Sequence, residues 1–320
     1  MITAILFIIL GFVLLMGGAE YAVRGAVAIA NRLRIPSLII GLTIVALGTS
    51  VPEFVVSIKS ALTGNAGIAV GNVIGSNIAN VLLVLGASAL IYPIGCDKSA
   101  FYRDFSFLFV VTSVFAFFVM NGRLVCWNGW ELLVFLVLFL AYNYFGMQKG
   151  ENPEDEIPSQ LVNSSWWIIF GALLGGLCAI AYGSDFLVRG AVDLARIFGV
   201  SEEIIGVTII AIGTSMPEMA TSCVAAFRHQ NGIALGNVVG SNIWNIVFVM
   251  GATAAITDVD VARQFISFDI WVMMITSFML LPMLLFKNKI TRYEGAFMLL
   301  CFAAYLYAQL LIGRGNWVLM

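Results

Sequence analysis

Two short segments place a proline and a glutamate inside apolar stretches of the chain: GTSVPEF at 48–54 and GTSMPEM at 213–219. Because proline lacks a backbone N–H and clashes with the carbonyl four residues earlier, each should interrupt a helix and free carbonyl oxygens. Threonine and serine hydroxyls lie next to those carbonyls, and Glu53 or Glu218 supplies a carboxylate. Carboxylate and carbonyl oxygens are the ligands of hard cations such as calcium, and hydroxyl and carbonyl oxygens also suit sodium. The two segments therefore predict a cation site.

A second motif follows each of these segments: GNVIGSNIAN at 71–80 and GNVVGSNIWN at 236–245. Its polar residues are spaced four apart and therefore share one helix face. They are Asn72, Ser76 and Asn80 in one copy and Asn237, Ser241 and Asn245 in the other. Such side chains can simply join helices in a membrane, but their intact repetition beside matching carboxylates favours cation binding. We expect Asn77 and Asn242, which point off this face, to pack or cap.

Both motifs belong to a longer internal repeat. Residues 41–86 align without a gap to residues 206–251, with 24 identities in 46 positions. The same register continues upstream, where GGAEYAVRGA at 17–26 faces YGSDFLVRGA at 182–191. An ungapped match of this length indicates that the chain contains two copies of one structural unit.

The composition is that of an integral membrane protein. Hydrophobic residues make up 61% of the 320 residues and charged residues only 11%, against about 25% charged residues in soluble domains. A helix needs about 20 apolar residues to cross a bilayer, and ten runs of the chain qualify. They are 2–30, 36–62, 67–92, 104–120, 129–146, 166–195, 203–227, 232–256, 266–286 and 291–312. Continuous runs such as FLFVVTSVFAFFVM exclude a β-barrel, whose strands alternate, so we predict an all-α fold with ten transmembrane helices.

Ten crossings give five helices to each copy. Because five is odd, the chain enters the second copy from the opposite side, so the two copies form inverted five-helix repeats, as in secondary transporters whose substrate site lies near the midplane. The predicted units are 1–146 and 166–320, joined by a polar linker at 147–165. Ten of the 16 Lys and Arg residues fall on the side reached after odd-numbered helices, and such an excess marks the cytoplasmic side. This predicts a cytoplasmic linker that acts as a flexible hinge, and both termini outside.

The remaining polar residues predict no further chemistry. The five cysteines lack C-x-x-C spacing and the single histidine, His229, falls in a loop, so neither a metal cluster nor a disulfide framework is expected. Neither H-E-x-x-H nor G-x-S-x-G occurs, so we expect no enzyme and no cofactor. Glu20 with Arg24, and Asp185 with Arg189, are four apart and should form structural or gating pairs. Three acids near predicted helix ends should be interfacial: Glu131, Asp104 and Asp269.

The two motifs resemble those of the sodium/calcium exchanger family of the cation/calcium antiporter superfamily, whose members carry paired GTSxPE and GNVxGSN motifs in inverted five-helix halves. The resemblance covers essentially the whole chain. It implies that helices 2, 3, 7 and 8 form an ion-binding core, across which helices 1 and 6 slide. It also implies a calcium site made by Glu53 and Glu218 with the carbonyls of Thr49 and Thr214. The implied sodium and central ligands are Ala46, Ser50, Ser76, Asn80, Ala211, Ser215, Ser241 and Asn245.

The chain departs from part of that family at Asn80 and Asn245, because certain members carry an aspartate at one of these two positions. Ion stoichiometry and potassium dependence are therefore left open. The sequence contains no large cytoplasmic regulatory domain of the kind found in animal exchangers. This predicts a prokaryotic type without calcium-sensing regulation.

The resulting hypothesis is an antiporter in the cell membrane that exchanges sodium for calcium, with both ions competing for one midplane site. Its partners would be calcium and sodium ions and membrane lipid, without nucleic acid or an obligate protein partner. One alternative keeps the fold and exchanges protons for calcium through Glu53 and Glu218, although the many hydroxyls favour sodium. A potassium-dependent exchanger is a further alternative. A cation channel is less well supported, because channels usually arrange symmetric subunits around a pore.

Overall fold

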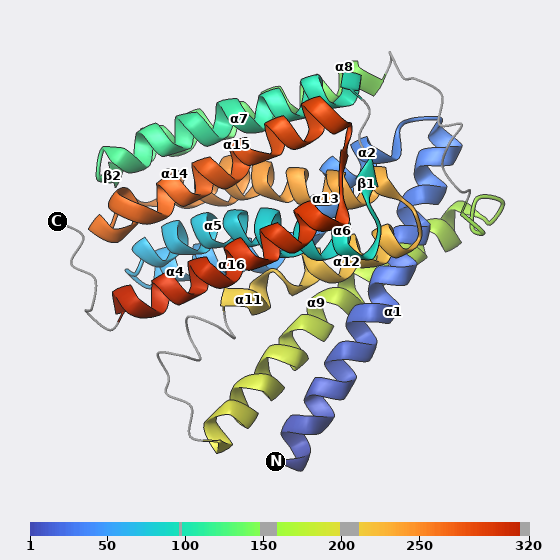
Figure 1. Cartoon of the computed structure of the whole chain (residues 1–320), viewed down its shortest axis with the longest axis horizontal. Coiled ribbons are helices and arrows are strands. Elements are labelled where there is room, and N and C mark those ends of the chain that lie inside the picture. Colours follow the sequence, from blue (N-terminus) through green and yellow to red (C-terminus); the bar gives the residue numbers. More distant parts are fainter. Residues whose placement is uncertain (96–97, 148–158, 199–210, 314–320) are drawn as a thin grey trace.

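The computed structural model describes residues 1–95, 98–147, 159–198 and 211–313, and this part of the chain is almost entirely helical (Figure 1). Its first half contains α1 (Ile2–Leu33), α2 (Ser37–Ile40), η1 (Gly41–Val45), α3 (Ala46–Thr49), α4 (Val51–Leu62), α5 (Gly67–Ala79), η2 (Asn80–Leu85), α6 (Gly86–Ile91), α7 (Lys98–Met120) and α8 (Cys126–Met147). Its second half contains α9 (Trp166–Ile197), α11 (Ala211–Thr214), α12 (Met216–Phe227), α13 (Asn231–Trp244), η4 (Asn245–Met250), α14 (Gly251–Ile256), η5 (Phe265–Asp269), α15 (Ile270–Lys287) and α16 (Arg292–Gly313). The η segments are π-helical turns, in which backbone hydrogen bonds span five residues instead of four.

Each of the ten predicted spans coincides with helix in the described residues, but fewer of these helices have the length and composition of a membrane span. Seven are long and apolar enough to cross a membrane, and α2 to α4 would add an eighth as one bent span. The predicted run 203–227 is described only from residue 211 onward; residues 203–210, and residues 148–158 of the linker, lie outside the described residues. The helical membrane architecture is thus confirmed, and the count of ten crossings stays a prediction.

The two proline segments interrupt their helices, as the sequence predicts. The helical stretches before and after Ser50 meet at 45°. Ser50 has φ −84° and ψ 4°, and its counterpart Ser215 has φ −88° and ψ 6°. Each proline then occupies the first turn of the following helix, where its missing N–H is not required. The break therefore leaves Glu53 and Glu218 in the first turns of α4 and α12.

Equivalent π-helical turns interrupt the two helices that carry the second motif. η2 begins at Asn80, and η4 begins at Asn245. A π turn changes the direction of the side chains that follow it, and such turns are frequent at functional sites. The four-residue spacing of the polar residues predicts a regular helix here, and both π-helical turns depart from it.

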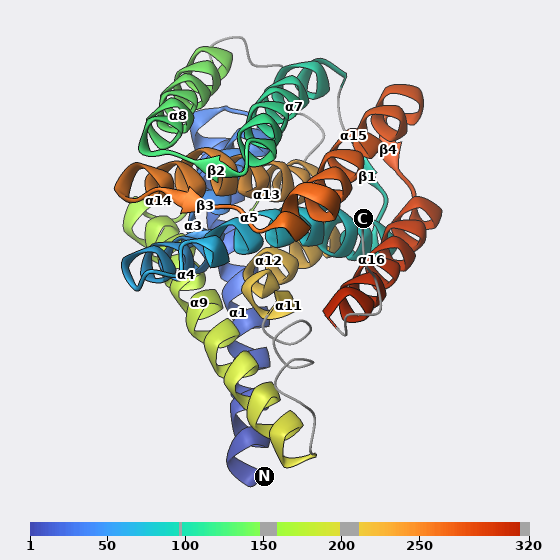
Figure 2. The ribbon, with the colours of Figure 1, turned by 90° about the vertical axis from the view of Figure 1, so that its left-hand side faces the viewer.

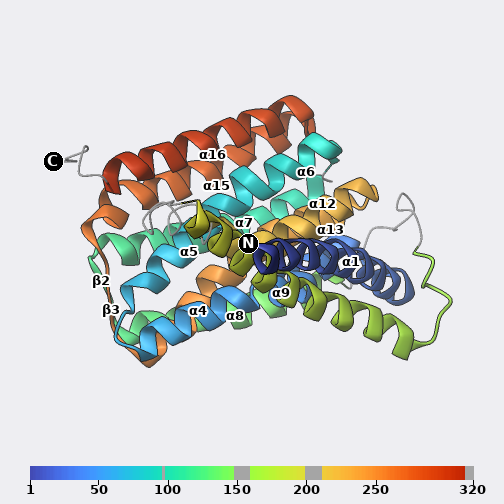
Figure 3. The ribbon, with the colours of Figure 1, turned by 90° about the horizontal axis from the view of Figure 1, so that it is seen from below.

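The most enclosed spans are the two that carry the second motif. In their most apolar windows, 72% of the residues of the span Gly67–Ile91 are buried and 94% of those of the span Asn231–Ile256, whereas none of the other described spans exceeds 33%. Figure 3 shows α4 and α16 on opposite sides of α5. These two spans therefore form the centre of the fold, as the family resemblance implies for helices 3 and 8.

Four two-residue strands connect the two halves of the chain. They are β1 (Ile94–Gly95), β2 (Arg123–Leu124), β3 (Val259–Asp260) and β4 (Lys289–Ile290). β1 pairs antiparallel with β4, and β2 with β3, so each pair takes one strand from each half. Figure 1 shows β1 and β2 at opposite ends of the bundle. Asp258 accepts hydrogen bonds from the Cys126 backbone N–H and from Arg123, both at 2.8 Å, and these hold the pKa of the Asp258 carboxyl below its usual range.

α1 and α9 form an antiparallel pair that slants away from the other helices (Figures 1 and 2). Glycines bring the two backbones together. A Cβ atom built on Gly18 would lie 2.7 Å from the Gly176 carbonyl oxygen, and one built on Gly176 would lie 2.5 Å from the Ala22 backbone nitrogen. The two helices thus pack backbone against backbone, which small residues permit in membranes.

We expect Gly18→Ala to destabilise the protein by about 1–3 kcal/mol, the usual cost of forcing an extra methyl group into a packed contact. Gly17→Ala is the matched control, because a Cβ atom on Gly17 would meet no atom of the described residues within 4 Å. Thermal unfolding of the purified protein in detergent should give a lower melting temperature for Gly18→Ala only. Equal melting temperatures would contradict the backbone contact.

Candidate cation site

The centre of the site is a pair of carboxylates with no basic partner. The side chains of Glu53 and Glu218 are fully buried, and they lie close enough for their charges to repel one another. The segments 41–58, 67–86 and 206–227 contain no Lys or Arg. Within the described residues, no three His, Cys, Asp or Glu side chains gather as metal ligands. A cation between the two carboxylates would therefore need additional ligands from hydroxyl, amide or carbonyl oxygens.

Such oxygens are present, and they lack hydrogen-bond partners. Eight buried side-chain oxygens around the motifs are unpartnered, in four pairs related by the repeat. They are Ser50 Oγ and Ser215 Oγ, both carboxylate oxygens of Glu53 and of Glu218, and Asn80 Oδ1 and Asn245 Oδ1. Burying a polar atom without a partner costs about 1–3 kcal/mol, and in native proteins such atoms usually face a water or an ion. This oxygen set fits a hard cation.

Neighbouring hydroxyls complete the surroundings of the two carboxylates. Ser76 lies beside Glu53. The hydroxyls of Thr49, Ser50 and Ser241 lie beside Glu218, although none reaches its carboxylate in hydrogen-bond geometry. The structure thus brings together residues from both motifs and from both halves of the chain.

Two asparagines fix the carboxylate-bearing helices to the second motif. Asn72 Nδ2 donates to the Glu53 carbonyl at 3.1 Å and to Ser57 Oγ at 2.9 Å. The equivalent Asn237 Nδ2 donates to the Glu218 carbonyl at 3.3 Å and to Ser222 Oγ at 2.9 Å. These bonds hold the main chain in place at Glu53 and at Glu218. Their sequence signal was the four-residue spacing of the polar face.

Asn77 and Asn242, expected to pack or cap, position the two central asparagines. Asn80 Nδ2 donates to Asn242 Oδ1 at 3.0 Å, and Asn245 Nδ2 donates to Asn77 Oδ1 at 3.3 Å. The two bonds are equivalent under the repeat and cross between the halves of the chain. Because they occupy the amide NH₂ groups of Asn80 and Asn245, they leave the Oδ1 atoms of both residues for the site.

The remaining predicted ligands differ in availability. The Thr49 hydroxyl lies 3.1 Å from Asn237 Oδ1 and 3.2 Å from the Ala46 carbonyl oxygen. That carbonyl also accepts the Ser50 N–H at 3.0 Å. Because the Thr49 hydroxyl has a single proton, it donates either to the Ala46 carbonyl or to Asn237 Oδ1, and in the second case one lone pair of the carbonyl is available. Thr214 is half-buried. Ala211 is the first residue of α11, and its side chain lies outside the described part.

The two halves of the site differ in how tightly they are covered. α13 packs closely on the segment before the first break: Cβ atoms built on Gly236 and Gly240 would each lie 2.5 Å from a carbonyl oxygen, of Leu38 and Leu42 respectively. Trp244 Nε1 also donates to the Leu42 carbonyl at 3.1 Å. Around α5 there is instead a cavity of about 460 Å³, whose lining includes Ser76 and Thr214. The site is therefore closed on one side and adjoins a cavity on the other.

The chain is similar to known membrane exchangers over nearly its whole length. The family model described as "Sodium/calcium exchanger protein" matches residues 3–145 and 168–311. The chain belongs to the sodium/calcium exchanger family. Among its relatives, CaxA of Alkalimonas amylolytica is named an antiporter and is 39% identical over 96% of this chain and 98% of its own. The sodium/calcium exchanger MaX1 of Methanosarcina acetivorans is 31% identical over 94% and 97% of the two chains.

A solved structure of the sodium-calcium exchanger NCX_Mj has the same fold. It superposes with a TM-score of 0.81 and 32% identity, over 98% of each chain. A more distant relative, the Ca(2+)/H(+) antiporter ChaA of Bacillus subtilis, is 26% identical over 62% of this chain and 61% of its own. The family is one of transporters rather than enzymes, and these relatives support the coarse assignment of a cation/calcium antiporter.

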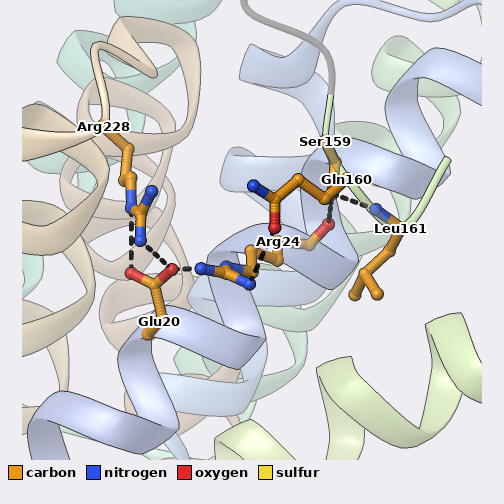
Figure 4. A network of polar contacts seen from close by, with 6 residues as sticks. All are labelled: Glu20, Arg24, Ser159, Gln160, Leu161 and Arg228. Carbon is orange, nitrogen blue, oxygen red and sulfur yellow. Dashed lines mark hydrogen bonds and ion pairs between the residues drawn. The ribbon is translucent and has the colours of Figure 1, made fainter.

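In this exchanger-family chain, an ion pair connects α1 to the end of α12 (Figure 4). The Glu20 carboxylate accepts hydrogen bonds from Arg24 on its own helix and from Arg228, whose Nε lies 3.0 Å away. Ser159 and Gln160 also contact Arg24, which ties the end of the linker to α1. The predicted pair is thus part of a network between helices.

The equivalent pair in the second half is simpler. Asp185 and Arg189 form an exposed ion pair at 2.9 Å within α9. The position equivalent to Arg228 is Thr63, which carries no charge. Among the residues that the structure describes, the network therefore occurs in the first half only, and it holds α1 to the core.

We expect Glu20→Gln to speed calcium uptake into proteoliposomes, because α1 would be freed from the end of α12. Partly exposed ion pairs contribute up to about 1 kcal/mol, so the rate should rise at most about fivefold. Asp185→Asn is the matched control and should change the rate by less than about twofold, since its pair bridges no second helix. If both variants behave alike, Glu20 does not restrain α1.

Proposed function

We propose that the protein exchanges sodium for calcium across the membrane, with both ions using the site between Glu53 and Glu218 in turn. The observation that carries this proposal is the set of eight unpartnered buried oxygens contributed equally by the two halves of the chain. Carboxylates supply the charge that calcium requires, and hard cations accept carboxylate and amide oxygens together. Since the ions share ligands, one must leave before the other binds, and this competition couples the two fluxes.

Calcium would bind to Glu53 and Glu218 together with the carbonyls of Thr49 and Thr214. The proposed sodium and central ligands are Ala46, Ser50, Ser76, Asn80, Ala211, Ser215, Ser241 and Asn245. The free hydroxyls of Ser50 and Ser215 support the sodium assignment most directly. The Ala46 carbonyl accepts the Ser50 N–H, and its second lone pair can bind an ion when the Thr49 hydroxyl donates to Asn237 Oδ1.

The proposed topology is ten membrane crossings in two inverted five-helix repeats, 1–146 and 166–320. The strand pairing supports it, because β1 and β3 occupy equivalent positions of the two halves yet pair at different ends of the bundle (Figures 1 and 2). Inversion would bring both glutamates to the same depth. We further propose that the 147–165 linker is cytoplasmic and that both termini lie outside, on the distribution of Lys and Arg.

Proton/calcium exchange is the second candidate, favoured by the likeness to ChaA and by two buried carboxylates able to carry protons. Proton exchange gives no role to the unpartnered serine hydroxyls, whereas sodium exchange uses them as ligands. A potassium-dependent exchange keeps the same site and adds an ion. The driving ion is therefore decided by flux measurements in which sodium, potassium and pH gradients are imposed separately.

Removing either carboxylate should abolish exchange. In proteoliposomes with an outward sodium gradient, we expect Glu53→Gln and Glu218→Gln each to lower calcium uptake at least tenfold, which corresponds to about 1.4 kcal/mol or more of lost ion binding. Glu131→Gln is the control, because Glu131 bonds to Asn128 at the start of α8 and should keep wild-type uptake. Wild-type uptake that is driven by a pH gradient in sodium-free buffer, and not by sodium, would refute the proposal in favour of proton exchange.

The serine hydroxyls separate sodium binding from calcium binding. We expect the double substitution Ser50→Ala with Ser215→Ala to raise the sodium concentration for half-maximal exchange at least about fivefold, since a hydroxyl contact contributes about 1 kcal/mol. The apparent calcium affinity should change by less than about twofold by the same scale. Ser113→Ala, which removes an exposed hydroxyl bonded to the Phe109 carbonyl, is the control. An unchanged sodium dependence would remove these hydroxyls from the site.

A further inference from the structure

A third carboxylate is buried in the helix bundle, apart from the central pair. Asp269 is only 1% exposed, so protein encloses it, and the expectation that it lies near the membrane interface stays a prediction. It is the last residue of η5, the π-helical turn before α15. Acids within membrane-spanning segments are rare and usually mark ion pathways.

Polar side chains of α16 saturate one of the two oxygens of this carboxylate. The Tyr305 hydroxyl donates to Asp269 Oδ1 at 3.0 Å, and Gln309 Nε2 donates to the same oxygen. Gln264 Nε2 in turn donates to Gln309 Oε1 at 2.7 Å, which fixes the orientation of that amide. Asp269 Oδ2 has no hydrogen-bond partner. Of the basic residues that the structure describes, none pairs with Asp269.

Asp269 lines the same cavity of about 460 Å³ that adjoins the central site. Tyr305 and Gln309 line it together with Asp269, and its other polar lining includes Asn72 and Ser76. A cation in this cavity would therefore lie in a space that is lined both by Asp269 and by Ser76, which is a proposed sodium ligand. The two neutral donors on Oδ1 stabilise a charged carboxylate, and a single negative charge matches a monovalent ion.

The repeat provides an internal comparison. The equivalent of Asp269 is Asp104, whose side chain lies outside the described residues, so the acid is present in both halves. Its partners differ: β2 matches β4, and Gly129 matches Gly295, with an offset of 166, so Phe139 and Asn143 stand at the positions of Tyr305 and Gln309, and both are buried. Phe139 has no hydroxyl, and the Asn143 amide donates to the Phe139 carbonyl at 2.9 Å, so the tyrosine donor at Asp269 is particular to the second half.

We propose that Asp269 Oδ2 is the anchor of an accessory sodium site in this cavity, separate from the site between Glu53 and Glu218. The inference rests on the proposed sodium transport, because sodium is the monovalent ion that would pass through the cavity. The Asp269 carboxylate would balance the charge of a sodium ion in the cavity before that ion reaches the oxygens of the central site.

Binding of radioactive sodium to the purified full-length protein tests the proposal without transport. The double variant Glu53→Gln with Glu218→Gln removes the central charges, so the sodium that it still binds reports the accessory site. We expect this variant to retain a single saturable sodium. Adding Asp269→Asn should lower that binding at least tenfold, whereas adding Glu131→Gln should not change it.

Asp269→Glu, which keeps the carboxylate, should bind sodium within about tenfold of the double variant, a difference of about 1.4 kcal/mol. The proposal is overturned if the double variant binds no sodium, if Asp269→Asn leaves binding intact, or if both substitutions at Asp269 abolish it equally. A failure of sodium/calcium exchange would instead appear in the flux of the wild-type protein. The two failures are thus distinguishable.

Discussion

The burial of two carboxylates is the constraint on which the rest of this structure depends. Glu53 and Glu218 are both fully buried and close enough for their charges to interact, and the segments 41–58, 67–86 and 206–227 contain no lysine or arginine. A buried charge without a counter-ion is costly. The surrounding oxygens therefore contribute by binding, together with the two carboxylates, a cation that offsets their charge. The helix breaks at Ser50 and Ser215 place the glutamates in first turns, and Asn72 and Asn237 hold those turns in position.

Much of this arrangement could be predicted from the sequence because it depends on local chemistry. Proline fixes where α4 and α12 begin, and a spacing of four places Asn72, Ser76 and Asn80 on one face. The repeat then identifies the second member of each pair. What could not be predicted depends on neighbours that are distant in the sequence. The bonds from Asn80 to Asn242 and from Asn245 to Asn77 cross between the halves, and no pattern within either motif specifies them.

The π-helical turns show a second limit of sequence reasoning. η2 and η4 start at Asn80 and Asn245, so a regular helical period assigns the wrong direction to the residues that follow. Asp269 shows a related limit: its position near the start of a predicted span gives no sign of its hydrogen bonds with Tyr305 and Gln309. In both cases the backbone departs from the ideal α-helix that the spacing argument assumes.

The absence of an acid at Asn80 and Asn245 has an electrical consequence. With only two carboxylates, the central site is neutral when it holds one calcium ion or two sodium ions. A third sodium ion would give the loaded core a net positive charge, and moving one elementary charge through a potential of 100 mV changes the free energy by about 2.3 kcal/mol. In the proposed exchange, every sodium ion beyond two would therefore make the membrane voltage, as well as the ion gradients, a determinant of the direction of transport.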